Sequence, residues 1–165
     1  MFREMRRKRQ ALSSTEIIRI LQRRTSGVLA LSGSDGWPYA VPLSFVYDEG
    51  KIYFHCAGSG HKLDIIRQNF RASFCVIDQD QIVPEEYTTL FRSVILFGQI
   101  RILEDPQEKR AAIEMLAARY APEDTEQNRT RAIDREWEPL CMLEMQIAHM
   151  SGKEAIELVK EKPFR

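Results

Sequence analysis

Residues 38–62 read PYAVPLSFVYDEGKIYFHCAGSGHK, and this stretch contains the strongest strand and turn signals of the chain. Apolar residues alternate from Tyr39 to Tyr47, which predicts a half-buried strand. The Asp-Glu-Gly sequence at 48–50 predicts a turn, and residues 51–57 predict the next strand. Upstream, residues 28–31 form a short apolar run before an Asp-Gly turn. We therefore expect a three-stranded antiparallel meander over residues 27–57.

The remaining sequence predicts a mainly β domain with peripheral helices. Helices are expected over about 13–25, 61–69, 105–121 and 125–136, and further strands over 72–77, 93–103 and 140–150. Residues 79–89 are polar and contain Pro84, which indicates a loop, and Ser-Gly-Lys at 151–153 indicates a turn. Gly98 predicts a bulge or a close approach of another backbone or of a ligand. About six strands without alternating βαβ units predict a small closed barrel with helices outside it.

Composition narrows the possible functions. The 165 residues form one domain by size, and 24 Lys+Arg balance 24 Asp+Glu, so a dedicated nucleic-acid binder is disfavoured. No apolar run is long enough to cross a bilayer and no signal-peptide core follows the basic start, so we expect a cytoplasmic protein without a membrane partner. Residues 1–12 are either a solvated basic arm or a contact for nucleic acid or an anionic ligand. The three cysteines, at 56, 75 and 141, predict neither a disulfide framework nor a zinc site.

The segment from His55 to Lys62 concentrates polar groups where a strand ends and a helix begins. Ser59 and Gly60 allow close backbone approach, and a helix N-terminus followed by Lys62 attracts a phosphate. The alternative is an ordinary strand-to-helix turn with a surface lysine. His55 and His61 could form a metal pair, but no carboxylate or thiolate is spaced to complete the site.

Pro42 interrupts an otherwise strong strand pattern. Proline cannot donate to a β-ladder, so this position is predicted to be either a simple edge or a place where a planar heterocycle is recognised. No Ser-His-Asp arrangement or carboxylate pair is identifiable, so no catalytic residue is predicted.

These motifs, together with RSVILFGQIRILEDPQEKRAAIEMLAARY at 92–120, resemble the pyridoxamine-phosphate-oxidase-like flavin-binding split-barrel superfamily. Within it, the nitroimidazole-resistance branch is the most similar. The resemblance extends over about residues 5–153. It implies a six-stranded antiparallel split β-barrel of the FMN-binding type. It also implies a homodimer with two FMN molecules in the grooves between subunits.

The resemblance implies a set of FMN contacts. These are Val41, Pro42, Leu43 and Ser44 at the isoalloxazine ring, His55 and Ala57 near the ribityl chain or ring, Ser59, Gly60, His61 and Lys62 at the phosphate, and Ser93, Ile95 and Phe97 across the subunit boundary. The tail at 156–165 lacks the Arg-x-His pattern of pyridoxamine phosphate oxidases proper, which argues against that substrate.

We therefore expect an FMN-dependent oxidoreductase that passes electrons from a reduced nicotinamide to a small electrophile such as a nitro compound. FAD or haem is a less favoured cofactor. The alternative function is a non-enzymatic flavin or haem binder or sensor, for which His55, His61 and His149 are candidate axial ligands.

Overall fold

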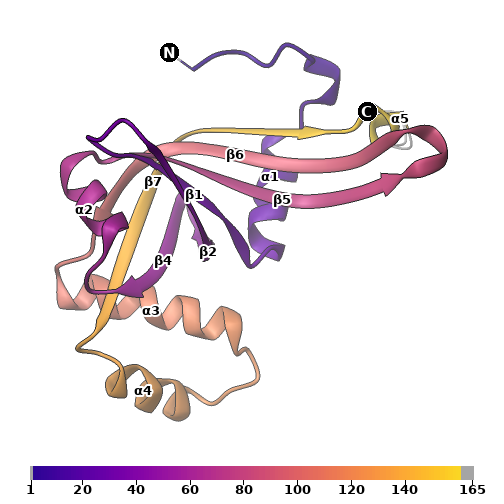
Figure 1. Ribbon diagram of the computed structural model, residues 1–165. Coiled ribbons are helices and arrows are strands. Elements are labelled where there is room, and N and C mark those ends of the chain that lie inside the picture. Colours follow the sequence, from indigo (N-terminus) through magenta and orange to yellow (C-terminus); the bar gives the residue numbers. More distant parts are fainter. Residues whose placement is uncertain (1, 161–165) are drawn as a thin grey trace.

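The computed structural model describes residues 2–160. The chain forms one antiparallel β-sheet with helices around it (Figure 1). In order, the elements are a 3₁₀ turn at Lys8–Gln10, α1 Ser14–Arg23, β1 Ser26–Ser32, β2 Pro38–Ser44, β3 Val46–Asp48, β4 Lys51–Ala57, α2 His61–Gln68, β5 Arg71–Val83, a 3₁₀ turn at Pro84–Glu86, β6 Thr88–Ile102, α3 Pro106–Tyr120, α4 Glu126–Arg135, β7 Leu140–Glu154 and α5 Ile156–Lys160. None of the described helices is long and apolar enough to span a bilayer.

The sheet has seven strands in the order β2-β1-β5-β6-β7-β4-β3, and all neighbouring strands are antiparallel. The prediction of a closed barrel of six strands was therefore wrong, because the sheet in residues 2–160 has seven strands and does not close. The single strand expected over 39–47 breaks into β2 and β3. Within the described residues these two strands are not paired, although they follow one another in sequence, so the sheet is open.

Phe45 is the residue at which the chain leaves β2 and enters β3. Its side chain is fully buried, and its N–H donates to the Thr25 carbonyl at 3.2 Å. The Tyr120 hydroxyl, at the end of α3, also accepts from the Phe45 N–H at 3.0 Å and contacts the carbonyls of Thr25 and Phe45. Tyr120 thus holds the backbone at the bend. On either side of this bend lie β2 and β3, which are the two end strands of the sheet.

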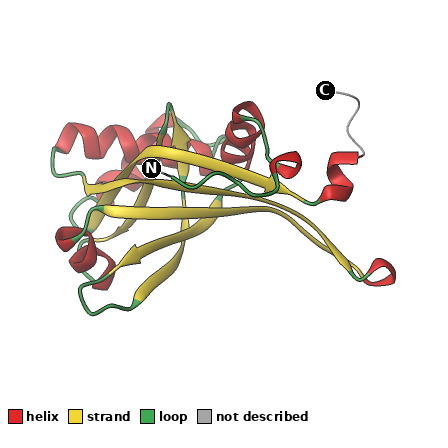
Figure 2. Ribbon diagram, turned by 90° about the horizontal axis from the view of Figure 1, so that it is seen from above, coloured by secondary structure: helices red, strands yellow, loops and turns green. Residues whose placement is uncertain are grey.

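β5 and β6 form a long hairpin that projects beyond the body of the molecule (Figure 2). The loop predicted over 79–89 was wrong, because residues 79–83 pair with 88–92 and only the 3₁₀ turn and Tyr87 separate the two strands. Residues 79–89 are polar, and for this reason their extended structure was not predicted. Beyond the sheet body, side chains on both faces of the hairpin meet solvent, so the alternation that marks a half-buried strand is lost.

The core consists of two clusters on opposite faces of the sheet. The larger cluster packs α1 and α2 against the inner face, where Phe45, Phe54 and Phe74 are fully buried and meet edge to face. The smaller cluster lies between α3, α4 and the other face of β3, β4 and β7. Side chains cap the starts of two helices: Ser13 and Glu16 form a capping box on α1, and Asp105 caps α3.

Gly98 lies at a break in the register between β6 and β7, as predicted, and a side chain there would collide with the backbone carbonyl of Gln146. β7 continues to Glu154, so the turn predicted at 151–153 was wrong. The last residues of β7 pair with β6 and also hold the basic arm. Ala11 bridges to Lys153, and the Leu12 N–H donates to the Gly152 carbonyl at 2.9 Å.

Candidate functional site

The N-terminus of α2 offers free backbone donors. Gly60 is the N-cap residue and supplies no side-chain cap, while its carbonyl accepts from the N–H groups of Leu63 at 2.9 Å and Asp64 at 3.3 Å. The N–H groups of His61 and Lys62 precede these bonds and have no acceptor within the helix. Gly60 has a φ of 130°, and a Cβ atom there would meet no atom within 4 Å. The helix end is therefore open in front of Gly60.

β2 presents an unpaired backbone edge. It lies at one end of the strand order and pairs only with β1. Because Phe45 is hydrogen-bonded to Thr25, ladder alternation directs the backbone groups of residues 39, 41 and 43 toward β1. The backbone groups of Ala40, Pro42 and Ser44 then point to the open edge. Pro42 lies where its missing N–H costs no ladder bond, which confirms the predicted edge position.

β4 has a second open edge near its end. β3 pairs only with residues 51–53 of β4, because the chain turns away at Phe45. The Gly58 N–H donates to the carbonyl of Pro139, the residue just before β7, at 3.0 Å, so the even-numbered residues of β4 bond toward β7. The backbone groups of His55 and Ala57 therefore point to the side that β3 leaves uncovered.

A ring contact joins two parts of the predicted site. The Tyr39 ring at the start of β2 meets the His61 ring at the start of α2 edge to face, with 4.9 Å between ring centroids. The residues predicted at 41–44 and at 55–62 thus belong to neighbouring segments. The side chains of Val41 and Leu43, however, pack against the core, so β2 offers a ligand mainly its backbone and the outward residues Pro42 and Ser44. Tyr39 was not among the predicted site residues, although its alternation with Val41 placed it on the same strand face.

Ser93, Ile95 and Phe97 lie elsewhere in this chain. They are on β6, which is separated from β2 by β1 and β5 and from β4 by β7. All three alternate with the buried Val94 and Leu96 and therefore face outward; Ile95 is 41% exposed and Phe97 38%. One chain does not bring them to α2, and their assignment across a subunit boundary stays a prediction.

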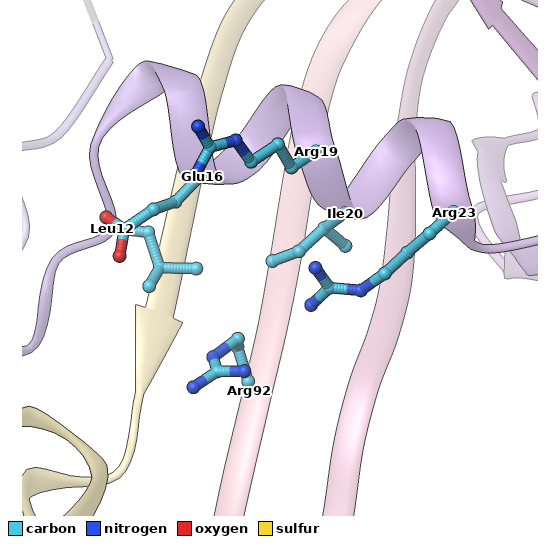
Figure 3. Close-up of a pocket in the computed structure, with 6 residues that line it drawn as sticks. All are labelled: Leu12, Glu16, Arg19, Ile20, Arg23 and Arg92. Atoms are coloured by element: carbon cyan, nitrogen blue, oxygen red, sulfur yellow. The ribbon is translucent and has the colours of Figure 1, made fainter. Parts of the chain in front are cut away.

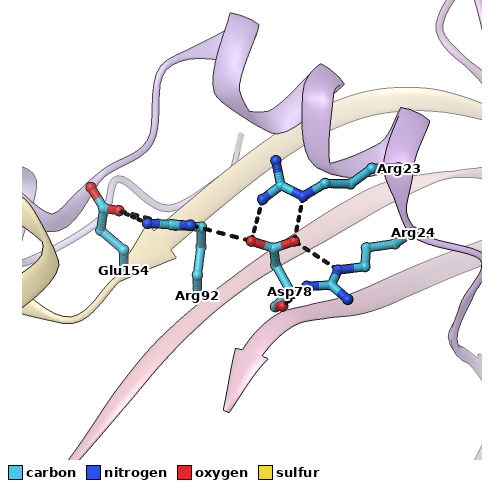
Figure 4. Close-up of polar contacts among 5 residues, drawn as sticks. All are labelled: Arg23, Arg24, Asp78, Arg92 and Glu154. Atoms are coloured by element: carbon cyan, nitrogen blue, oxygen red, sulfur yellow. Dashed lines mark hydrogen bonds and ion pairs between the residues drawn. The ribbon is translucent and has the colours of Figure 1, made fainter. Parts of the chain in front are cut away.

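A cationic cavity of about 170 Å³ lies between α1 and the hairpin, lined by Leu12, Glu16, Arg19, Ile20, Arg23 and Arg92 (Figure 3). Most of its positive charge is already neutralised. Arg23, Arg24 and Arg92 converge on the buried Asp78, and Arg92 also pairs with the buried Glu154 at 3.1 Å (Figure 4). Burial raises the pKa of Asp78, but hydrogen bonds from Arg23 and Arg24 outweigh it and hold that pKa below its ordinary value. This network joins α1 to the hairpin, and sequence reasoning missed it because its members are far apart in sequence.

Three further cavities are lined by residues of the basic arm, of α3 and of the outer face of the sheet. Of the predicted site residues, only Phe97 lines one of the four. In the described part of the chain, no cluster of three or more His, Cys, Asp or Glu residues could hold a metal ion.

Comparisons with known proteins agree with this architecture. A sequence model described as pyridoxamine 5'-phosphate oxidase matches residues 13–154. No curated protein matches the chain. Among solved structures, a candidate 5-nitroimidazole antibiotic resistance protein from Bacteroides thetaiotaomicron is 19% identical, with a TM-score of 0.71 and coverage of 87% of this chain and 86% of that one.

Two further structures are named for their cofactors. A FAD-binding protein from Mesorhizobium loti is 26% identical, with a TM-score of 0.62 and coverage of 88% of this chain and 95% of that one. A FAD and heme binding protein from Mycobacterium smegmatis is 20% identical, with a TM-score of 0.71 and coverage of 94% and 81%.

Proposed function

The chain belongs to the pyridoxamine 5'-phosphate oxidase family, and from this premise we propose that it binds FMN with the phosphate at the N-terminus of α2. The observation that carries the proposal is the open end of α2: two backbone donors without helical acceptors, a glycine cap with space in front of it, and Lys62 in the first turn. We propose further that the bound flavin makes the protein an oxidoreductase.

The α2 terminus suits a dianion. Helix N-termini carry about half a positive charge, and charge-assisted hydrogen bonds are about twice as strong as neutral ones. Lys62 adds a full charge. The nearby Asp64 is paired with Arg67 at 3.2 Å, so its negative charge is partly offset. Ser59 and His61 are exposed beside the same donors and can add side-chain hydrogen bonds.

The open edges of β2 and β4 suit the rest of the molecule. Ala40 and Ser44 direct both N–H and C=O groups away from β1, and Pro42 directs a carbonyl. The pyrimidine edge of a flavin carries alternating donors and acceptors, which such a backbone edge can match. His55 and Ala57 offer the same kind of groups from β4.

Bound flavin supplies hydride and electron transfer, and the residues of this chain bind and orient it. In the proposed reaction a reduced nicotinamide is the donor and a small electrophile, such as a nitro compound, is the acceptor. The chain's own contribution is to fix the phosphate with Lys62 and the α2 amides and to hold the ring against the edge of β2. The Tyr120 hydroxyl at the Phe45 bend keeps that edge in place.

We propose that a second copy of this chain completes the site. The outer face of β1, β5 and β6 exposes a row of apolar side chains, with Val28 36%, Ile95 41% and Ile77 59% exposed. In the register, Pro42, Val28, Cys75 and Ile95 lie side by side across four strands. Exposed apolar patches of this kind mark interaction surfaces, and burying this one in a homodimer would bring a partner's strand toward the flavin.

The test is a titration with FMN followed by the quenching of flavin fluorescence, with NADH and NADPH then added anaerobically to follow bleaching of the bound flavin. We expect saturation at one FMN per chain, elution as a dimer, and bleaching by one of the two nucleotides. Failure to bind FMN would end the proposal. Binding without bleaching would leave a flavin carrier rather than an oxidoreductase.

A haem-binding function is the second candidate. His55 and His61 are both exposed close to the open edges, whereas the His149 ring is stacked on Phe2 at 4.6 Å between centroids. Addition of hemin would produce a Soret band that is lost in a His55→Ala or His61→Ala variant if this candidate is right. A haem spectrum unchanged by both substitutions would rule out these ligands.

A further inference from the structure

Cys56 and Cys141 lie directly opposite one another on neighbouring strands. They are register partners in the antiparallel pair β4–β7. Residues directly opposite in such a pair point to the same face of the sheet, and both belong to the larger core cluster or pack against it. Cys75, in contrast, is on β5, which β6 separates from β7, and it faces the other side.

The two thiols differ in exposure and influence one another. Cys56 is partly exposed, and Cys141 is buried with 8% of its surface accessible. Burial and, to a smaller extent, the neighbouring Cys141 together raise the pKa of Cys56 to about 12, and the positive charge of Lys62 opposes both effects. Lys62 and Cys141 are thus both close enough to Cys56 to act on its thiol.

We propose that Cys56 and Cys141 are a reversible dithiol–disulfide pair at the end of β4, oxidised by low-molecular-weight disulfides. The Cys56 thiolate attacks the small disulfide R–S–S–R, which forms a mixed disulfide and releases one thiol, R–SH. The Cys141 sulfur then attacks the Cys56 sulfur and expels the second R–SH. Both protein thiols lose their protons to the two released thiols, and the small disulfide takes up the two electrons.

The strand geometry makes the resulting bond labile. The hydrogen bond from Gly58 to Pro139 places Cys56 and Cys141 in a hydrogen-bonded pair, for which Cα atoms lie about 5.5 Å apart. That separation is within the disulfide range, but opposite Cβ atoms at about 4.5–5.5 Å must approach to about 3.8 Å. Closing the bond therefore strains the strand pair, and strained disulfides are the easily reduced ones.

The position of the pair gives its oxidation a consequence. Only Ala57, the last residue of β4, separates Cys56 from the loop at 58–60 that leads into α2, and β4 lacks a β3 neighbour at this point. A disulfide would tie the free end of β4 to β7 next to Lys62. The pair exists without any cofactor, so this inference and the proposed flavin site can fail independently.

The experiment treats folded, flavin-free protein with glutathione disulfide, quenches with acid, alkylates the remaining thiols in denaturant and maps tryptic peptides by mass spectrometry. Trypsin places the three cysteines in separate peptides, 52–62, 72–92 and 136–153. We expect peptides 52–62 and 136–153 to be joined, with 72–92 not cross-linked, and dithiothreitol to reverse the link. The rate should rise about tenfold per pH unit between 7 and 9, because the Cys56 thiolate is a minor species there.

Matched variants identify the partners. A Cys75→Ser variant should form the same link, whereas Cys141→Ser should leave Cys56 as a stable mixed disulfide with glutathione. Two results in the unsubstituted protein would overturn the inference, whether or not the variants fold. One is alkylation of both Cys56 and Cys141 after prolonged oxidation, and the other is a Cys56–glutathione adduct that never resolves to the cross-link.

Discussion

Replacing Lys62 by methionine removes one positive charge from the α2 terminus and keeps an unbranched side chain that is one atom shorter. The backbone donors of His61 and Lys62, the Gly60 cap and the edge of β2 remain as they are. The substitution therefore separates the contribution of the ammonium group from that of the helix end.

The expected loss of FMN affinity follows from the position of the Lys62 side chain. A hydrogen bond to a charged group contributes roughly 1.5–3 kcal/mol. Lys62 is only half-buried, so solvent screening keeps its contribution near the lower end, about 1.5–2 kcal/mol. Since each 1.4 kcal/mol corresponds to a factor of ten, the affinity for FMN should fall about 10- to 30-fold.

The assay compares FMN with riboflavin, which has the same ring and ribityl chain but no phosphate. We expect the loss for FMN only, with riboflavin affinity within about threefold of that of the unsubstituted protein. Arg67→Met is the matched control, because Arg67 is an exposed cation of the same helix that pairs with Asp64. It should change FMN affinity less than about threefold.

Two outcomes would contradict the proposed contact between Lys62 and the FMN phosphate. If Lys62→Met leaves FMN affinity unchanged, the ammonium does not contact the phosphate. If FMN and riboflavin lose affinity equally while thermal stability is retained, Lys62 acts on the ring or on the shape of the site and not on the phosphate.

Three further changes test the local structure. Gly60→Ala should lower the free energy of unfolding, measured by urea denaturation, by about 1–3 kcal/mol, because a φ of 130° is strained for alanine. Gly58→Ala, whose Cβ would meet only ordinary contacts, should cost less, and equal losses of stability would contradict the strain at Gly60. Tyr120→Phe should lower stability by roughly 1 kcal/mol and weaken FMN binding, since the bend at Phe45 loses a hydroxyl partner; an unchanged melting temperature would show that the bend holds without it. Asp78→Asn should destabilise by about 2 kcal/mol at neutral pH, and the deficit should shrink as pH falls below the ordinary carboxyl value of 3.8; a deficit independent of pH would exclude the ion pairs as its source.

The sign of the Asp78 prediction follows from its lowered pKa. The folded protein holds the carboxylate ionised to lower pH than the unfolded chain does, so the stabilisation is fully present above the unfolded pKa. It is lost as pH falls through the folded value. The substituted protein lacks this carboxylate, so the two melting curves should converge in acid.

Local patterns predicted the elements well where one face is buried. The helix starts near Ser13 and Asp105 and the Gly98 bulge all follow from short-range chemistry, and each is present. The hairpin beyond Gln79 was missed because its side chains alternate between two solvated faces. The break at Phe45 was missed because alternation continues through it, and the side-chain hydrogen bond at the bend comes from Tyr120, 75 residues away.

In the candidate site, too, the parts that are contiguous in sequence were predicted, and the parts that depend on the arrangement of strands were not. The loop and helix start at 55–62 were identified because glycine, lysine and a helix N-terminus are contiguous in sequence. The open edges of β2 and β4 depend on strand order, which sequence patterns do not determine. The Tyr39–His61 contact and the Cys56–Cys141 pair likewise depend on register between distant segments.

A crystal structure of the protein with FMN would show directly whether the N-terminus of α2 holds the phosphate. We expect phosphate oxygens within hydrogen-bonding distance, about 2.7–3.2 Å, of the His61 and Lys62 backbone nitrogens, with the ring against the edge of β2. A phosphate bound instead in the arginine-lined cavity beside α1, or a flavin that touches neither α2 nor β2, would contradict it.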